Sequence, residues 1–374
     1  MSRNFLTRFS SFSNHFKNGL GKRSVDATVG DRRASLPSET EGGATFDESA
    51  MGPLTVYRHR AMACDFEVSV NEADAAREEP FAVFDLIDRQ EETLSVFRAT
   101  SLVSRINLLA AEMDIPLPRS LFEQLVLCRH LWEETDGAFD ITASPLWKQW
   151  GFARGEGRVP TPAEIDEALG KVGMQHLILN EERLTVAFDV PGVEINFGAI
   201  GKGFALDEAT SFLSRSSLDD YLIHGGMSSA VARGGRLRDQ VRDRKGEVRP
   251  CWTIGVADPL RPEHRLATLR LVDEAVGTGG SGRQYFFHRG KRLSHIIDPK
   301  TGYPAVGVLS ATVVASSAAE ADALSTAFFV MGAEKTEMYA RKHPDCGALL
   351  VLDSPTGKQD IVTFNIDHSR CRIE

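Results

Sequence analysis

Alternating apolar and polar positions predict a folded region, rich in strands, that begins near Leu54. The run LTVYRHRAMACDFEVSV alternates from there and is rich in β-branched and aromatic residues, which favours a first strand. Helical periodicity occupies residues 76–95 and 119–135, and TPAE at 161–164 predicts a capping box that opens a third helix. Further strand-like runs lie at 177–181, 184–189, 193–197, 221–224, 228–232, 252–256, 267–272, 309–315 and 347–352.

The mixture of many strands with fewer helices predicts an α+β fold. Its sheet is expected to be mixed but largely antiparallel, with packed helices, in a single domain over residues 54–374. Residues 234–249 are polar and charged, so they predict a solvated loop. Residues 30–53 are rich in Gly, Ser, Thr, Glu and Pro and predict a linker.

Residues 1–25 differ from the rest because they carry basic residues and no acidic one. Phenylalanines recur there at helical spacing, at Phe5, Phe9, Phe12 and Phe16. Two interpretations stay open for residues 1–53: a disordered basic tail with its linker, or a weakly amphipathic helix of the transit or membrane-surface type.

Composition excludes several classes of protein. The net charge of −9 argues against a general nucleic-acid binder, which needs a basic face. Five scattered cysteines, without a CxxC or a Cys/His cluster, signal neither a disulfide scaffold nor a zinc site. No apolar stretch is long enough for a membrane-spanning helix, so we expect no integral membrane protein. No secretory or lipoprotein signal is evident; the compartment stays open, with the cytoplasm or a membrane surface favoured over a lipid anchor.

Two segments carry glycine turns suited to ligand contact. In TDGAFDITASPLWKQWGF (135–152), a sharp turn is followed by a small residue, an aromatic and a carboxylate, although a turn into a helix with a tryptophan core explains it as well. In INFGAIGKGFALDEA (195–209), a strand leads through three glycines around Lys202 into a helix, whose N-terminus favours an anion such as phosphate. A simple tight turn explains this second segment equally well.

Two later segments carry candidate catalytic and metal-binding groups. In GKRLSHIIDPKTGYP (290–304), His295 lies in a short apolar strand beside a turn, where general bases tend to be found, although a lone histidine is more often a structural residue. In LSATVVASSAAEADALSTAFFVMG (309–332), Ser317 and Glu320 predict a second capping box. Asp322 and Thr326 then share a helix face, and a carboxylate plus a hydroxyl is the oxygen chemistry that Mg²⁺ prefers.

Taken in order, these segments resemble the ApbE family of FAD:protein FMN transferases. The most specific matches are GAFDIT at 137–142, GKGFALD at 201–207, SHIIDPKTGYP at 294–304 and ADALSTAFFVMG at 321–332. The resemblance implies an ApbE-like, T-fold-like catalytic domain. It also implies an enzyme that uses Mg²⁺ and FAD as substrate, transfers FMN to a Thr or Ser hydroxyl of an acceptor protein, and releases AMP.

The resemblance also assigns roles to individual residues. Asp322 and Thr326, with Ser325 beside them, match metal-binding side chains, and Ala199 matches the residue that offers its main-chain carbonyl. His295 matches the proposed base that deprotonates the acceptor hydroxyl. Positions that match the cofactor site are Met62, Phe97, Ala138, Phe139, Asp140, Asn196 and Lys202.

This sequence departs from the family pattern at several positions. The usual Met-Gly-Thr is Met62-Ala63-Cys64, an Asp common before the glycine loop is Asn196, and the Gly-Gly-Asp motif ends in Met227. An acidic residue frequent after Ser101 is replaced by Leu102. These losses leave two alternatives open beside the transferase, namely a metal-dependent FAD pyrophosphatase and a non-catalytic flavin-binding protein.

The acceptor is expected to be a separate protein. The sequence contains no self-acceptor site of the Asp-Gly-x-Thr-Gly-Ala-Thr type. Family analogy points to a flavoprotein subunit of a membrane redox complex as the partner.

Overall fold

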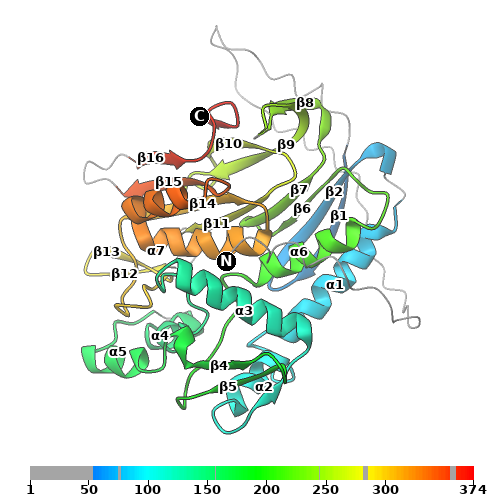
Figure 1. The fold of residues 1–374 in the computed structure, drawn as a ribbon. Helices are drawn as coiled ribbons and strands as arrows, with labels where there is room; N and C mark the ends of the chain where they lie inside the picture. The colour runs from blue at the N-terminus through cyan, green and yellow to red at the C-terminus, as the bar shows by residue number, and fades with distance from the viewer. Residues whose placement is uncertain (1–53, 75–76, 156, 244, 281–284, 354–358) are drawn as a thin grey trace.

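An antiparallel sheet of eight strands forms the centre of the structure (Figure 1). The computed structural model describes residues 54–74, 77–155, 157–243, 245–280, 285–353 and 359–374; the tail and linker expected over 1–53 lie outside these residues. The strands follow the order β1 (Leu54–Ala61), β2 (Cys64–Asn71), β6 (Tyr221–Gly225), β7 (Ser229–Arg233), β11 (Ala275–Gly280), β14 (Val308–Ala315), β15 (Gly347–Asp353) and β16 (Gln359–Phe364).

Helices cover one face of this sheet, and a second sheet covers the other. The helices are α1 (Glu79–Leu94), α6 (Gly201–Leu213) and α7 (Ala318–Lys342). The second sheet has the order β17 (Cys371–Ile373), β10 (Arg265–Leu271), β9 (Val248–Ala257) and β8 (Arg236–Arg242). On β14, Val313 belongs to the helix-side core while Val314 packs with the second sheet. Successive side chains of a strand point to opposite faces, so a strand buried on both faces is apolar throughout.

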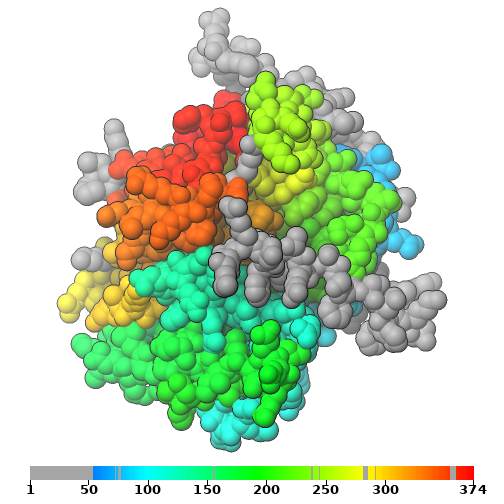
Figure 2. Space-filling view, in the orientation of Figure 1, coloured from blue at the N-terminus to red at the C-terminus, as the bar shows by residue number. Residues whose placement is uncertain are grey.

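A smaller layer of helices and short strands adjoins the main sheet. It contains α2 (Leu102–Leu109), α3 (Arg119–Glu134), α4 (Ser144–Gln149), α5 (Pro162–Leu169) and a sheet of β3 (Ile115–Pro116), β5 (Thr185–Phe188) and β4 (Leu177–Asn180). In Figure 2, α3 lies directly beside α7. Tyr339 joins these helices, because its hydroxyl donates to Glu134 Oε2 at 3.2 Å. The separate hairpin of β12 (Tyr285–His288) and β13 (Lys291–Ser294) completes the described strands.

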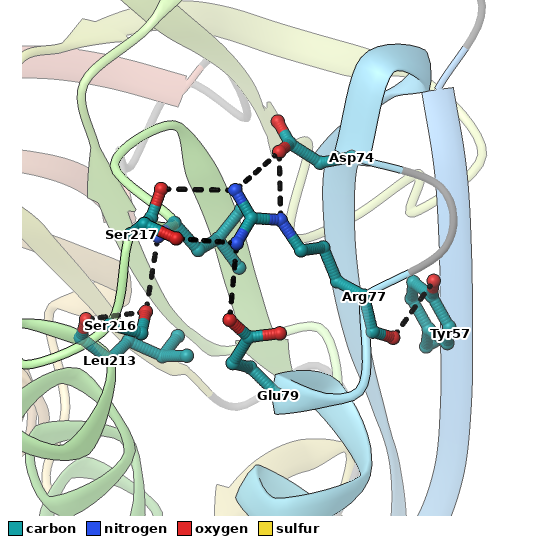
Figure 3. Close-up of polar contacts among 8 residues, drawn as sticks. Tyr57, Asp74, Arg77, Glu79, Leu213, Ser216 and Ser217 are labelled. Atoms are coloured by element: carbon teal, nitrogen blue, oxygen red, sulfur yellow. Dashed lines mark hydrogen bonds and ion pairs between the residues drawn. The ribbon is translucent and has the colours of Figure 1, made fainter.

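Arg77 ties the beginning of α1 to the loop after α6 (Figure 3). Its Nε donates to Asp74 Oδ1 at 3.0 Å and its Nη1 to Ser217 Oγ at 2.7 Å. Glu79, the first residue of α1, also pairs with the guanidinium at 3.3 Å. Several donors of one planar group therefore fix α1 relative to the end of α6.

The fold class predicted from sequence is confirmed, since every strand pair in the described part is antiparallel and helices pack on the main sheet. Helices α1 and α3 lie within the predicted ranges. The capping box of α5 is also confirmed: Thr161 N donates to Glu164 Oε2 at 2.7 Å, and Glu164 N donates to Thr161 Oγ1.

Three local predictions were wrong. The single first strand is a hairpin, because Met62 and Ala63 adopt positive φ values of 49° and 59° and reverse the chain. Residues 234–249 contain β8 and the beginning of β9 instead of a loop; an edge strand tolerates polar residues. Residues 193–197 form no strand, because Asn107 bonds both the N–H and the C=O of Ile195 in place of a neighbouring strand.

A helix that spans a membrane must be both long and apolar. Among the helices of the described residues, none has the length and apolar character that crossing a membrane requires.

Candidate active site

Helices α6 and α7 cap each other at their first turns. Asp322 of α7 accepts a hydrogen bond at Oδ2 from Gly203 N in the first turn of α6, at 2.8 Å. In return, Asp207 of α6 accepts at Oδ1 from Ala318 N, the first residue of α7, also at 2.8 Å. A Cβ on Gly203 would lie 2.4 Å from the carbonyl oxygen of Ala318, so only glycine allows this approach. The carboxylate of Asp322 is thereby held at the N-terminus of α6.

The second prediction of a capping box needs a correction at this point. Ser317 Oγ accepts from Glu320 N at 3.3 Å, as predicted. The carboxylate that completes the cap is that of Asp207, which accepts from Ser317 Oγ at 2.8 Å and from Ala319 N at 2.9 Å. A side chain from another helix therefore caps the first N–H groups of α7, and the Glu320 carboxylate makes no hydrogen bond to Ser317 N in the described part of the chain.

Asp322 is buried but well supplied with donors. Its side chain accepts from Ser229 Oγ at 2.6 Å as well as from Gly203 N. Burial raises the pKa of Asp322 above its ordinary value, and the nearby charge of Lys202 and these two hydrogen bonds offset only part of that rise. The arrangement places a carboxylate, a lysine and a helix N-terminus together.

The neighbouring residues of α7 add hydroxyl oxygens. Thr326 is half-buried, one helical turn after Asp322. Ser325 is buried, and its hydroxyl donates to the main-chain oxygen of Asp322 at 2.8 Å, which leaves its lone pairs as acceptors. Ala199 lies in the turn directly before α6. Carboxylate, hydroxyl and carbonyl oxygens suit Mg²⁺. No group of three His, Cys, Asp or Glu side chains able to hold a metal occurs among the described residues.

The loop before α6 is braced by Asn196. Its Oδ1 accepts from Gly198 N at 2.8 Å, and its main-chain N–H donates to Ile141 O at 2.8 Å. This second bond connects the glycine loop to the segment that contains Ala138, Phe139 and Asp140. Two of the segments singled out in the sequence are therefore adjacent in the structure.

Met62 and Phe97 lie on the α1 side of this loop. Met62 N donates to Glu91 Oε2 at 3.0 Å, and its Cε would lie 3.5 Å from a Cβ on Gly201. Phe97 follows α1 in a turn and is 80% exposed, so its ring is available to a ligand. The Met62 side chain is thus close to Gly201, the residue that precedes Lys202 at the start of α6.

The segment Ala138–Phe139–Asp140 is largely inside the protein. Ala138 and Phe139 are buried, and Asp140 accepts from Thr142 N at 2.7 Å and Thr142 Oγ1 at 2.5 Å. Asp140 also borders an open cavity of about 550 Å³, whose wall includes Trp132, Asp136, Gly137, Gly173 and Lys300. This cavity is distinct from the group around Asp322 and Lys202, which does not line it.

Asp140→Asn is expected to change the pH dependence of stability. Burial raises the pKa of Asp140 from 3.8 to about 6, against the hydrogen bonds from Thr142 and Trp132. The folded state therefore binds the proton more tightly, and this contribution to stability is complete below pH 3.8 and lost as the pH rises through 6. At pH 7 the variant should be more stable than the wild type by up to about 3 kcal/mol, with no difference near pH 3.5.

Urea unfolding at both pH values measures this difference. Asp136→Asn is the matched control, because Lys300 lowers the pKa of the exposed Asp136, so this variant should gain no stability at pH 7. Equal unfolding free energies of Asp140→Asn and wild type at pH 7 would contradict the expectation.

His295 lies in a different cluster. It directly follows β13 and is half-buried, with its ring edge-on to Phe152 at a centroid distance of 6.3 Å. Trp150 and Phe286 pack in the same aromatic group, and the Trp150 indole donates to Gly302 O at 2.8 Å. The structure thus brings Lys202, Asp322, Ser325 and Thr326 together, and it holds His295 on a separate, firmly packed loop.

Four residues of the site were missed in the sequence. Ser229 donates to the Asp322 side chain, and Asp207 accepts from the first residue of α7. Asn107 binds the main chain of Ile195, and Glu91 binds the main-chain N–H of Met62. The GKGFALD match at 201–207 contained Asp207 without indicating its role.

The fold and the site define a class of protein. A buried carboxylate with hydroxyl neighbours lies at a helix N-terminus beside a lysine, on an α+β scaffold, which suits a metal cation next to a phosphate group. The chain belongs to the ApbE family, whose model matches residues 62–350.

Two curated relatives share one description. A protein of Klebsiella pneumoniae (strain 342), described as FAD:protein FMN transferase, is 31% identical over 307 residues, covering 80% of this chain and 85% of the relative. A protein of Treponema pallidum (strain Nichols) with the same description is 33% identical over 288 residues, covering 75% and 78%. The chain therefore spans most of each relative.

Solved structures share the fold. The ApbE protein of Thermotoga maritima superimposes with a TM-score of 0.71 at 30% identity, covering 82% of this chain and 96% of that one. The apo form of the flavinyl transferase ApbE of Pseudomonas stutzeri gives a TM-score of 0.70 at 27% identity, covering 83% and 94%. The ApbE-like fold expected from the sequence is confirmed.

Proposed function

We propose that this protein is an FAD:protein FMN transferase that, with Mg²⁺ held by Asp322, transfers FMN from FAD to a Ser or Thr hydroxyl of an acceptor protein and releases AMP. The family membership and the descriptions of the relatives support the transferase activity. The observation that carries the metal and phosphate assignment is the position of the Asp322 carboxylate, bonded to Gly203 N at the start of α6 and close to Lys202.

The residues around α6 account for binding of the pyrophosphate. The dipole of α6 favours an anion near its N-terminus, where Gly203 N already donates to Asp322 and Gly201 N to Phe197 O. Lys202 in the first turn adds a full positive charge. Asp322 and Thr326, with Ser325 and the Ala199 carbonyl, supply oxygen ligands for the cation. When bound, Mg²⁺ would neutralise the negative charge that develops on the leaving phosphate.

The flavin and the adenine require apolar and polar surfaces nearby. The contact of Met62 with Gly201 and the exposed ring of Phe97 support these two residues as partners of the planar rings. Ala138, Phe139 and Asp140 are joined to the same loop through the hydrogen bond between Asn196 and Ile141. Family resemblance supports all of these residues as FAD-binding positions.

His295 is proposed as the general base. The acceptor hydroxyl oxygen forms a bond to the phosphorus of the FMN moiety, the bond between that phosphorus and the AMP oxygen breaks, and the hydroxyl proton passes to an imidazole nitrogen of neutral His295. The edge contact with Phe152 supports a restrained orientation of the imidazole ring.

The acceptor and the domain boundaries complete the proposal. We infer that residues 54–374 form the catalytic domain, which is supported by the family match within it at 62–350. The acceptor is proposed to be a separate flavoprotein subunit, of a membrane redox complex by family analogy.

The test is a transfer assay with an acceptor protein used by a characterised member of the family. Purified protein, FAD and Mg²⁺ are incubated with this acceptor, and covalent fluorescence on a denaturing gel is compared with AMP release. Equal amounts of covalent flavin and AMP support the transferase. AMP without covalent flavin indicates a pyrophosphatase, and bound FAD without AMP indicates a carrier. An acceptor with alanine in place of its modified hydroxyl residue is the control.

Lys202→Ala is expected to weaken FAD binding roughly 10- to 100-fold at low salt, the range for loss of a hydrogen bond to a charged group. The wild-type affinity should fall more steeply with salt than that of the variant, because a charge contact with phosphate is screened. Fluorescence titration at low and high salt measures both effects. Lys171→Ala is the control, since Lys171 pairs with Glu167 on α5. Unchanged affinity in Lys202→Ala at both salt concentrations would remove Lys202 from the phosphate site.

A further inference from the structure

Two hydrogen-bond donors from outside α7 hold the carboxylate of Asp322. Gly203 N of α6 binds Oδ2 at 2.8 Å, and Ser229 Oγ, on the first residue of β7, binds Oδ1 at 2.6 Å. Ser229 is itself buried, with 2% of its surface exposed. Both oxygens of the carboxylate are therefore oriented by groups that lie far away in the sequence.

Main-chain packing fixes the distance between Ser229 and Asp322. Ser229 pairs with Gly277 of β11, and Ser228 O accepts from Thr278 N at 2.7 Å. A Cβ on Gly277 would lie 2.3 Å from the main chain of Ala321, so α7 rests directly on β11 at this point. The serine and the carboxylate are thus attached to elements that cannot shift without disturbing the core.

We propose that Ser229 is a positioning residue for the metal-binding carboxylate of Asp322, an inference that rests on the proposed function. The last torsion of an aspartate side chain is broad, so the orientation of its oxygens depends on outer partners. Hydrogen-bonded partners of a ligating carboxylate set its direction toward the metal, and their loss lowers metal affinity 10- to 100-fold. Ser229 leaves the remaining lone pair of Oδ1 free for the cation while it fixes the plane of the carboxylate.

Two neighbouring serines do not share this role. Ser325 donates its hydroxyl proton to the main-chain oxygen of Asp322 and not to its side chain. Ser228 Oγ is 3.4 Å from Ser229 Oγ, to which it donates a weak hydrogen bond because the Ser229 proton is used toward Asp322, and Ser228 is only partly buried. Ser228→Ala therefore makes the same chemical change one residue away, without removing a bond to the carboxylate.

The test compares Ser229→Ala, Ser228→Ala and the wild type as full-length proteins. Mg²⁺ is titrated into each protein in the presence of FAD, and the binding constant is measured by calorimetry and by the rise in thermal midpoint with Mg²⁺ concentration. We expect Ser229→Ala to need 10- to 100-fold more Mg²⁺ for the same response, and Ser228→Ala to match the wild type. In the transfer assay, Ser229→Ala should recover most of its rate at saturating Mg²⁺, with an unchanged KM for FAD.

Each outcome decides a separate point. Lower Mg²⁺ affinity in Ser229→Ala, with wild-type affinity in Ser228→Ala, supports the positioning role. Lower thermal stability of Ser229→Ala with wild-type Mg²⁺ affinity would overturn it, because Ser229 then only satisfies a buried carboxylate. If the wild type transfers FMN but does not bind Mg²⁺, the positioning role of Ser229 is overturned and the transferase activity stands. If the wild type binds Mg²⁺ normally but transfers no FMN, the proposed transferase function is overturned and the positioning role of Ser229 stands.

Discussion

Asp322→Asn is expected to lower FMN transfer by about 10³-fold or more, because loss of a ligating charge removes several kcal/mol of stabilisation by the metal. Asparagine suits the test better than alanine. Its Oδ1 can accept from Gly203 N, and its amide can donate to Ser229 Oγ, so both partners of Asp322 keep a hydrogen bond. Calorimetric titration measures the loss of Mg²⁺ binding, circular dichroism checks that the fold is kept, and the transfer assay measures the lower rate.

The matched control is Asp207→Asn, the other carboxylate of the mutual cap. Asp207 accepts three hydrogen bonds at the start of α7, so this variant should lower the thermal midpoint. Its folded fraction should still bind Mg²⁺. Full transfer activity in Asp322→Asn, or equal loss of Mg²⁺ binding in both variants, would contradict the assignment of Asp322 as a ligand.

His295→Asn is expected to lower FMN transfer roughly 10²- to 10⁴-fold while FAD and Mg²⁺ binding stay close to wild type, the range for removal of a positioned acid or base. The site of Asp322 and Lys202 is built from α6, α7 and β7, whereas His295 packs in the aromatic cluster with Phe152. Loss of the imidazole should therefore leave the binding groups in place. FAD affinity by fluorescence and AMP release on both proteins measure the two effects.

The pH profile supplies an independent check on His295. The wild-type rate should fall as the pH decreases and the imidazole becomes protonated, because only the neutral ring accepts a proton. The residual rate of His295→Asn should lack this dependence. Wild-type turnover in the variant would exclude His295 from the chemistry, and loss of FAD binding together with folding would indicate a structural histidine.

Local patterns in the sequence predicted much of the scaffold. Strand-like apolar runs identified β6, β7, β14 and β15. β6 alternates between buried and partly buried residues, whereas β14 and β15 are buried on both faces and therefore read as nearly continuous apolar runs. The spacing of Asp322 and Thr326 placed them on one helical face, because residues four apart are neighbours on a helix. These are properties of one segment at a time, so they need no knowledge of the rest of the chain.

The partners of the site residues were decided by the tertiary structure. Asp322 and Gly203 are 119 residues apart, and Asp322 and Ser229 are 93 apart. Nothing near Ser229 in the sequence marks it as a partner of a carboxylate. The same holds for Met62, whose left-handed turn lacks the usual Asn-Gly signal and is held by Glu91.

The sequence by itself therefore determined the secondary structure of most elements, the family resemblance and the residue types available for chemistry. Only the tertiary structure decided how the carboxylate of Asp322 is oriented, that α6 and α7 cap each other, and that residues 193–197 form no strand. The physical reason is that backbone periodicity is encoded within a few residues, whereas the partner of a buried polar group depends on which distant segments the core brings together.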